Sequence, residues 1–281
     1  MTQVTTADFH THTTLSDGSL TAWELLLQAK RLQKTHIAVT DHDALQPAST
    51  FAEGDYLGVK VIPAIEFSAR DTKRNRRLHI LCYAYKKPEI LLPLCLATCR
   101  SRSVVSLKML TRLKEHFPLS DEFVLKYSTG SAAVYKWNIV SALYELGMLG
   151  ETKGKQYTDV FGYDGICGDL IKEEMAGYPS AETVIDVIHE AGGLAVLAHP
   201  FQYNSTEFLE ETAAAGDLDG VEVDHPSATD EQKTELIDTA KRHGLFKTGG
   251  SDFHGIYNHY PTGLLGKRHP YQDGFDRIVS N

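Results

Sequence analysis

Polar residues suited to metal binding follow short apolar runs along most of this chain, and this placement restricts the fold more than any other feature. Apolar runs of strand length that lead into polar loops lie at residues 4–12, 36–42, 59–67, 78–85, 194–200, 220–226 and 246–255. Helical patterns separate several of them. Residues 20–33 begin with Thr21 and Glu24 at capping-box spacing. Residues 180–193 have Ser180 as the expected N-cap and end in Gly-Gly, and another helix is expected to begin near Pro47. This alternation favours a parallel α/β sheet or barrel.

The middle of the chain has a different pattern. Residues 91–117 and 136–149 have helical patterns, and this region contains no histidine at the end of an apolar run. We interpret residues 88–180 as a helical insertion that caps a site. Residues 1–87 and 181–281 then form the first and second parts of the barrel.

Composition is typical of a globular protein and suggests a cytoplasmic one. The hydrophobic content is 42% and the charged content 23%. No apolar run approaches the roughly 20 residues of a membrane span, and the N-terminus lacks the basic and apolar regions of a signal peptide. The four cysteines form no Cys-x-x-Cys pair, which favours reduced thiols. We expect no membrane partner, and the sequence makes no prediction of the oligomeric state.

The net charge restricts the class of partner. A formal charge of -9 argues against a broad attraction to nucleic acid backbones. Three bound divalent cations would add +6 and bring this total to -3. The charge therefore disfavours a stable nucleic acid partner, but it is compatible with a small phosphorylated ligand.

Nine histidines and carboxylates are candidate metal ligands because of where they lie. Seven stand at or just beyond a strand end, His79 lies within its strand, and Asp17 lies in the loop after the first strand. The nine are His10, His12, Asp17, His42, Glu66, His79, His199, Asp252 and His254. Since the carboxyl ends of parallel strands meet on one face, residues far apart in sequence can meet there.

The residue types also point to metal chemistry. Imidazole and carboxylate are ligands of Zn, Mn and Fe, and no cysteine belongs to the set. His10 and His12 share a face of their strand, and Glu66 can bridge two cations. A single strand-end histidine is more often structural, and His79 alone fits a buried core position equally well. An unpaired Glu66 at the end of an apolar strand is costly, however, and nine such placements by accident are a poor alternative.

Six motifs in order resemble the polymerase-and-histidinol-phosphatase (PHP) family. They are DFHTHTTLSDG, AVTDHD, AIEF, LHIL, LAHP and GGSDFHG, within the first 85 and last 100 residues. The resemblance implies a distorted (β/α)7 barrel with a helical insertion and two to three divalent ions, Mn, Fe or Zn. It assigns His10, His12, Glu66 and Asp252 to one ion, Glu66, His79 and His199 to a second, and Asp17, His42 and His254 to a third.

The insertion and the GVEVDHP segment are similar to those of the stand-alone phosphoesterases of this family. Such enzymes hydrolyse nucleoside 3',5'-bisphosphates or short oligonucleotides, and a related branch acts on a ribose cyclic phosphate. Nucleotide-cleaving members commonly carry a Gly-Arg-Pro-His-Ile-Ala-like segment. Here residues 134–140 have Lys136 in place of the arginine and Asn138 in place of the histidine. Residues 248–255 are more similar to the cyclic-phosphate branch.

The resemblance implies a hydrolase in which a metal-bridging hydroxide attacks phosphorus of a small phosphorylated metabolite. Lys136 is the candidate phosphate ligand, His225 the candidate phosphate contact or proton donor to the leaving oxygen, and both are assigned as catalytic. Arg100 and Arg102 are candidate contacts to a second phosphate. Alternatively, Lys136 is an exposed lysine on a helix, and His225 is a loop histidine that orders the end of its strand. Arg100 and Arg102 could instead belong to a solvated helix face. The basic residues 73–77 are interpreted as an exposed hairpin loop.

Three other functions remain open at this stage. One is a 5'-3' exonuclease on short oligonucleotides, which the charge of -9 disfavours. Another is a metal-binding regulatory protein without turnover, which the intact ligand set disfavours. The third is an amidohydrolase on a similar cage, which the motif order disfavours.

Overall fold

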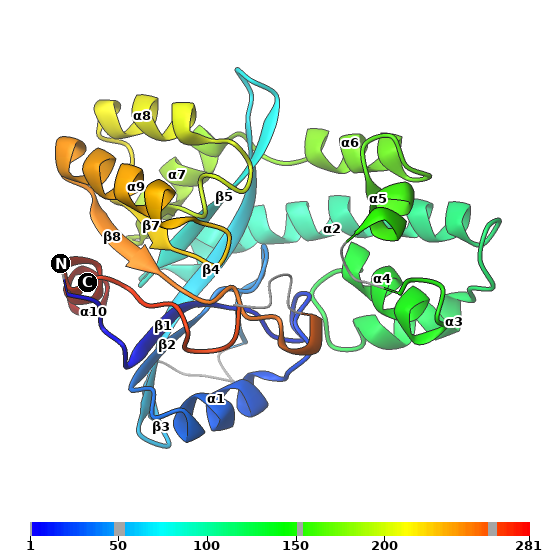
Figure 1. The fold of residues 1–281 in the computed structure, drawn as a ribbon, viewed down its shortest axis with the longest axis horizontal. Coiled ribbons are helices and arrows are strands. Elements are labelled where there is room, and N and C mark those ends of the chain that lie inside the picture. Colours follow the sequence, from blue (N-terminus) through cyan, green and yellow to red (C-terminus); the bar gives the residue numbers. More distant parts are fainter. Residues whose placement is uncertain (1, 48–53, 151–153, 258–262) are drawn as a thin grey trace.

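Seven strands form a nearly closed, barrel-like sheet (Figure 1), in a computed structural model that describes residues 2–47, 54–150, 154–257 and 263–281. In sheet order the strands are β1 (Ala7–Thr11), β2 (His36–Val39), β4 (Val59–Asp71), β5 (Arg76–Tyr83), β6 (Leu194–Leu197), β7 (Gly220–Asp224) and β8 (Phe246–Gly249). The α/β barrel predicted from the sequence is therefore confirmed. The helix expected near Pro47 would cover residues 48–53, which lie outside the described residues.

The barrel is distorted in its middle. β4 and β5 form an antiparallel hairpin, β5 also pairs antiparallel with β6, and the other neighbours in the ring are parallel. The short strand β3 (Gly54–Tyr56) pairs with β4 outside the ring. The hairpin is important for the site because it carries Glu66 on one strand and His79 on the next.

The ends of β8 and β1 approach each other and nearly close the ring. The backbone N–H of His12 donates to the carbonyl of Phe253 at 2.9 Å, and Thr11 forms a parallel bridge to Phe253. A Cβ on Gly250 would lie 2.3 Å from the Cβ of His10, so only glycine permits this approach. The closure brings the C-terminal motif against the N-terminal one.

Side chains alternate between the interior of the barrel and its surrounding helices. Ala64, Leu81 and Val196 belong to the interior cluster, whereas Ile65 and Ile80 pack with the helices outside. Because successive residues of a strand face opposite sides, the inner face of β4 continues from Ala64 to a polar position two residues later. Glu66, His79 and Glu222 therefore occupy inner positions of β4, β5 and β7.

Five helices of the described chain surround the sheet. They are α1 (Ala22–Arg31), α7 (Ala181–Glu190), α8 (Thr206–Ala215), α9 (Asp230–His243) and α10 (Gln272–Ser280). Two of them, α1 and α7, lie where the sequence predicts helices. Thr21 and Glu24 form the predicted capping box of α1, and Ser180 caps α7. Figure 1 shows α7, α8 and α9 on one side of the sheet, and α10 beside both termini.

The helices of the central region form a second body beside the sheet (Figure 1). They are α2 (Pro88–Leu113), α3 (Asp121–Leu125), α4 (Lys136–Glu145), α5 (Lys155–Phe161) and α6 (Gly168–Ala176). The described part of residues 88–180 contains no strand. Leu91 and Cys95 of α2 pack in the layer between the sheet and its outer helices, whereas Met109 and Leu113 pack in a separate core with α4 to α6. α2 thus joins the two hydrophobic cores.

One property of α2 differs from the sequence-based expectation. Its length and its mean hydropathy of 1.4 over an 18-residue window suffice for a membrane span, whereas no such segment was expected. Several of its side chains, including Cys99, Arg102 and Met109, are buried against the rest of the protein. One face of the helix is therefore packed against the rest of the protein in this structure, whereas Leu92, Leu96 and Val104 on it are exposed.

Candidate metal centre and pocket

The structure brings all nine predicted ligands together at one end of the barrel. His10, Glu66 and His79 lie within β1, β4 and β5, and the other six follow strand ends. These are His12 and Asp17 after β1, His42 after β2, His199 after β6, and Asp252 and His254 after β8. The prediction that Glu66 stands at a strand end was wrong, because β4 continues to Asp71 in its antiparallel pairing with β5. Eight of the nine are buried, and only His42 is partly accessible.

The first predicted set surrounds one position. The Nε2 atom of His10 lies 3.1 Å from Oε2 of Glu66 and 3.5 Å from Oδ1 of Asp252, and Nε2 of His12 lies 3.2 Å from each of these oxygens. Tetrahedral bonds of about 2.1 Å to one cation would separate ligand atoms by about 3.4 Å. The observed spacing is therefore that of four ligands around a cation.

Glu66 presents its two oxygens to different partners. Oε1 lies 2.7 Å from Nδ1 of His79 and 2.9 Å from Nε2 of His199, whereas Oε2 faces His10 and His12 and lies 3.2 Å from Nδ1 of His42. A carboxylate with two separate groups of nitrogen neighbours has the geometry of a bridging ligand.

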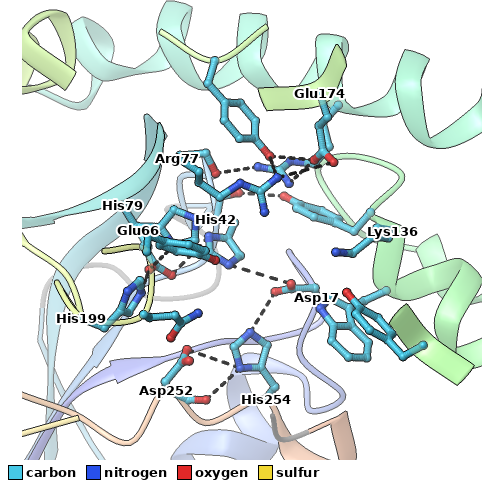
Figure 2. Close-up of a pocket in the computed structure, with 18 residues that line it drawn as sticks. Asp17, His42, Glu66, Arg77, His79, Lys136, Glu174, His199, Asp252 and His254 are labelled. Carbon is cyan, nitrogen blue, oxygen red and sulfur yellow. Dashed lines mark hydrogen bonds and ion pairs between the residues drawn. The ribbon is translucent and has the colours of Figure 1, made fainter. Parts of the chain in front are cut away.

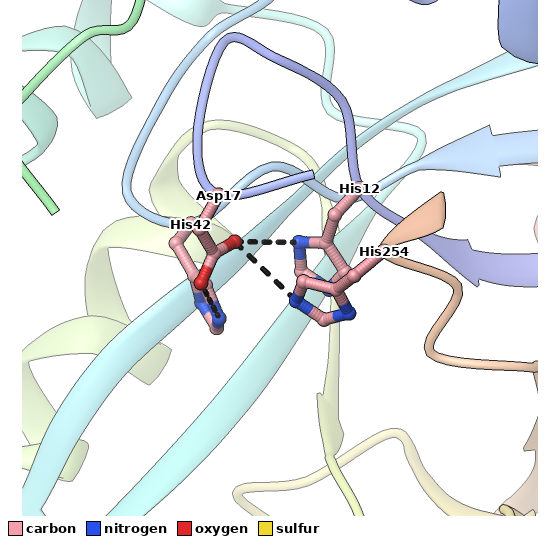
Figure 3. Close-up of side chains that lie close together, drawn as sticks. All are labelled: His12, Asp17, His42 and His254. Atoms are coloured by element: carbon pink, nitrogen blue, oxygen red, sulfur yellow. Dashed lines mark ion pairs between the residues drawn. The ribbon is translucent and has the colours of Figure 1, made fainter. Parts of the chain in front are cut away.

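The third predicted set lies around Asp17 (Figure 3). Oδ1 of Asp17 is 3.3 Å from Nε2 of His254 and 3.9 Å from Nδ1 of His12, and Oδ2 is 3.9 Å from Nε2 of His42. The ligand atoms of these four residues lie within 4.8 Å of one another. His12 lies between this group and the first one.

The polar atoms of the cluster fit a metal better than they fit one another. Within the described chain, Nε2 of His10, both ring nitrogens of His12, Nδ1 of His42 and Oε2 of Glu66 are buried and make no hydrogen bond of good geometry. Buried polar atoms are rarely left in this condition without a compensating group. Coordination of divalent cations would satisfy all of them.

The electrostatics of the cluster point in the same direction. Burial would raise the pKa of the Glu66 carboxyl, but nearby imidazoles, His42 foremost, hold it well below its usual range. Burial lowers the pKa of His79 to about 4, whereas Asp252 and Glu66 outweigh the burial of His12 and raise its pKa to about 10. A bound cation would displace this proton, so metal binding should release protons.

Glu222 supports the cluster from behind and was missed in the sequence. Its Oε1 accepts from Nδ1 of His10 at 2.9 Å, and its Oε2 accepts the backbone N–H of His199 at 3.0 Å. A proton on Nδ1 leaves the Nε2 lone pair of His10 free to face Glu66. The signal was a charged residue in the apolar run of residues 220–226, at an inner position of its strand.

His225 lies deeper than the sequence-based interpretation placed it. Its ring is buried, and its Nδ1 accepts the backbone N–H of Ser227 at 3.1 Å. The ring proton then lies on Nε2, 3.3 Å from Oδ2 of Asp252. His225 does not line the pocket described below, so this geometry favours an action on Asp252 over a contact with substrate.

The turns that carry three site residues adopt an unfavourable backbone conformation. The φ angles are +28° at His199, +51° at Asp252 and +53° at Asp43. Left-handed conformations are uncommon for residues other than glycine and concentrate at functional sites. Here they let the chain turn sharply after the strands, with the side chains of His199 and Asp252 facing the cluster and that of Asp43 facing Arg102.

A pocket opens above the cluster, and the insertion forms one of its walls (Figure 2). The barrel contributes candidate ligands, whereas the insertion contributes Tyr135, Lys136, Trp137, Tyr157, Glu174 and Tyr178. The hydroxyl of Tyr135 donates to the backbone carbonyl of His42 at 2.7 Å. The predicted phosphate ligand Lys136 therefore faces the same space as the cluster, as Figure 2 shows.

The two predicted arginines of α2 have different environments. Arg100 is exposed and lies outside the pocket lining. Arg102 is buried and donates to Oδ2 of Asp43 at 2.7 Å, Oγ of Ser68 at 2.7 Å and Oε1 of Glu174 at 2.9 Å. Two carboxylates match the charge of Arg102, which is neither a solvated residue nor an unopposed cation.

Arg77 lines the pocket, although residues 73–77 were interpreted as an exposed loop. The hairpin turn is present, but Arg77 lies within β5 and only 18% of its side chain is accessible. Lys73 is exposed and pairs with Glu211 of α8, whereas the side chain of Arg74 is only 15% accessible and pairs with Glu207 and Glu211. The interpretation was wrong for Arg77 because strand β5 begins two residues earlier than the sequence indicated, at Arg76.

Comparisons with known proteins identify the family. The sequence matches the model of the PHP domain over residues 8–189. It is 35% identical over 257 residues to a phosphoribosyl 1,2-cyclic phosphate 1,2-diphosphodiesterase of Eggerthella lenta, covering 90% of this chain and 96% of that protein. It is also 31% identical to the 5'-3' exoribonuclease Rnm of Escherichia coli, over 88% of this chain and 84% of the relative.

A solved structure supports the same assignment. The crystal structure of a metal-dependent phosphoesterase from Bifidobacterium adolescentis, described as putative, superposes with a TM-score of 0.79 at 28% identity. The superposition covers 98% of this chain and 95% of the other. The overall fold is thus shared, over nearly the whole of both chains, with that protein.

Proposed function

Because the chain belongs to the PHP family of metal-dependent phosphoesterases, we propose that it hydrolyses a ribose cyclic phosphate that carries a further phosphate. The observation that carries the proposal is the buried cluster of nine candidate ligands beside a pocket whose lining includes Arg77, Arg102 and Lys136. The similarity to the Eggerthella lenta enzyme supports the choice of substrate.

The donor set of the cluster suits two or three hard or borderline divalent cations. When bound, such ions activate water and neutralise charge on phosphate oxygens. His10, His12, Glu66 and Asp252 would hold one of them. Glu66, His79 and His199 would hold a second, and Asp17, His42 and His254 would hold a third.

The protein's own residues position the substrate and exclude water. Lys136 supplies a positive charge toward a phosphate of the substrate from the insertion wall, and the Tyr135 hydroxyl fixes the loop of His42. Glu222 sets the tautomer of His10, and the ring N–H of His225 orients Asp252. These interactions place the ligands before the substrate arrives, so little reorganisation is required.

A second candidate activity is 5'-3' cleavage of short oligoribonucleotides. The 31% identity to the exoribonuclease Rnm favours it. The distribution of charge disfavours it, because the pocket cations lie close to the cluster on a protein of net charge -9. The alternative of a metal-binding protein without turnover gives no account of the cationic residues that line the pocket beside the cluster.

Phosphate release from a substrate panel tests the proposal. The panel contains a ribose 1,2-cyclic phosphate with a 5-phosphate, adenosine 3',5'-bisphosphate, a short oligoribonucleotide and a simple monoester. Manganese-reconstituted protein, chelator-treated protein and Asp252→Ala are compared. Asp238→Ala serves as the matched control, because Asp238 lies on the exposed face of α9.

The proposal predicts release from the cyclic phosphate that is lost on chelation and in Asp252→Ala, but retained in Asp238→Ala. Preferential shortening of the oligoribonucleotide would select the second candidate. An absence of turnover across the panel by metal-loaded protein would refute both.

A further inference from the structure

Three cationic side chains enter the pocket, and their local charge balance separates them into two kinds. Arg102 is matched by the carboxylates of Asp43 and Glu174, as described above. Arg77 and Lys136 also line the pocket. Figure 2 shows both on the side of the pocket away from Asp252 and His254.

Arg77 is held in place without a carboxylate of its own. Its Nη2 donates to the Tyr178 hydroxyl at 3.2 Å, and its guanidinium lies 5.2 Å from the centre of the Tyr178 ring and 5.9 Å from that of Tyr203. The Glu174 carboxylate is 3.9 Å away and already accepts from Arg102 and from the Tyr178 hydroxyl at 2.7 Å. Arg77 is therefore rigidly placed and only weakly neutralised.

Lys136 is similarly unopposed. No carboxylate of the described chain lies within 4 Å of its ammonium group, which lies 5.4 and 6.0 Å from the ring centres of Tyr157 and Phe161. Glu174 acts on it only at longer range and already pairs with Arg102. Holding two unmatched cations in a partly buried pocket is unfavourable unless an anion joins them. The candidate ligands cannot supply this anion, because metal ions would consume their negative charge.

We infer that Arg77, together with Lys136, forms a second anion subsite that binds a phosphate of the substrate other than the one hydrolysed. This inference rests on the proposed function and extends it, because it makes Arg77 a determinant of specificity for doubly phosphorylated small molecules. The guanidinium fork can contact two oxygens of one phosphate. The flanking tyrosine rings fix its orientation and leave little freedom to be lost on binding.

The test compares two substrates that differ only in the second phosphate: ribose 1,2-cyclic phosphate with and without its 5-phosphate. Wild type, Arg77→Met, Arg77→Lys and the control Arg76→Met are assayed for kcat/KM. In Arg77→Met, methionine keeps an apolar side chain between Tyr178 and Tyr203. Glu174 still pairs with Arg102, so no buried carboxylate loses its cation. Arg76 is the adjacent residue of β5, is 38% exposed and bonds to the backbone carbonyl of Asn204 instead of lining the pocket.

Arg77→Met is expected to lower kcat/KM for the doubly phosphorylated substrate by about 10- to 100-fold, the effect of one charged hydrogen-bonding group. Its kcat/KM for the other substrate should stay within about twofold of wild type, and Arg77→Lys should recover part of the loss. Arg76→Met should resemble wild type with both. Equal losses with both substrates, or no loss with either, would overturn the inference.

Binding of ribose 5-phosphate to chelator-treated protein separates this inference from the proposed function. Calorimetry should detect binding by wild type and Arg76→Met that is weakened about 10-fold or more in Arg77→Met. That result supports the subsite even if no phosphoester in the panel is hydrolysed. Equal binding by wild type and Arg77→Met would overturn the subsite even if the enzyme is active.

Discussion

The substitution Arg102→Met tests whether a buried ion-pair network holds the insertion against the metal centre. Arg102 of α2 joins Asp43, which adjoins His42, to Glu174 of α6. Its removal leaves two buried carboxylates without their cation. Asp43 keeps a backbone N–H from Ser68 at 2.9 Å, and Glu174 keeps the Tyr178 hydroxyl, so neither is fully abandoned.

The expected loss in free energy of unfolding is about 3–5 kcal/mol, the usual consequence of removing one partner from a buried pair. For a chain of this length the loss corresponds to a fall in Tm of roughly 5–9 °C. Arg100→Met, two residues away on the exposed side of α2, should change stability by less than about 0.5 kcal/mol. Thermal unfolding by circular dichroism measures both.

The pH dependence of the stability difference between wild type and Arg102→Met identifies the cause of that difference. Burial raises the pKa of the Asp43 carboxyl, with Arg102 opposing the rise, so the pKa should be higher still without Arg102. When the pKa of a carboxyl is higher in the folded than in the unfolded protein, its protonation as pH falls stabilises the folded protein. The difference between wild type and Arg102→Met should therefore narrow from about pH 8 to about pH 5. An unchanged Tm, or a difference that widens on acidification, would refute the network.

Two further predictions concern residues away from the pocket. Glu222→Gln should weaken metal binding by about 10- to 100-fold, because it disturbs the tautomer of His10, with little change in the circular dichroism spectrum. A chelator competition measures the metal affinity, and an unchanged affinity would contradict this role of Glu222. The four cysteines are buried, and burial raises the pKa of Cys99 and of Cys167 to about 11. A thiol reagent at about pH 8 should therefore label the native protein slowly and the denatured protein at all four positions, and rapid labelling of the native protein would disprove their burial.

Local patterns predicted much of the fold, because each requires only short-range information. The capping box of α1, the Ser180 cap of α7 and the alternation of strands with helices all depend on neighbouring residues. The prediction that strand-end residues converge follows from the geometry of barrels, and the structure brings all nine candidates together. The metal-binding roles of these residues remain predictions.

The parts that sequence reasoning missed depend on contacts between distant segments. Arg77 resembles its exposed neighbours in sequence, and only the start of β5 and the packing of Tyr178 from the insertion turn it into the pocket. Whether Arg102 bound substrate or was matched by carboxylates depended on Asp43 and Glu174, which are 59 and 72 residues away. The role of His225 could not be predicted without knowing that Asp252, which follows a different strand, lies next to its ring.

Metal content and phosphate release measured on the same reconstituted samples test the central claim most directly. Elemental analysis of wild type should find two or three divalent ions per chain, with turnover of the cyclic phosphate that rises with metal content. Asp17→Asn should lose one ion, and Glu66→Gln should lose at least two together with all turnover, because Glu66 faces two groups of ligands. Full metal content or full turnover in Glu66→Gln would contradict the proposed site.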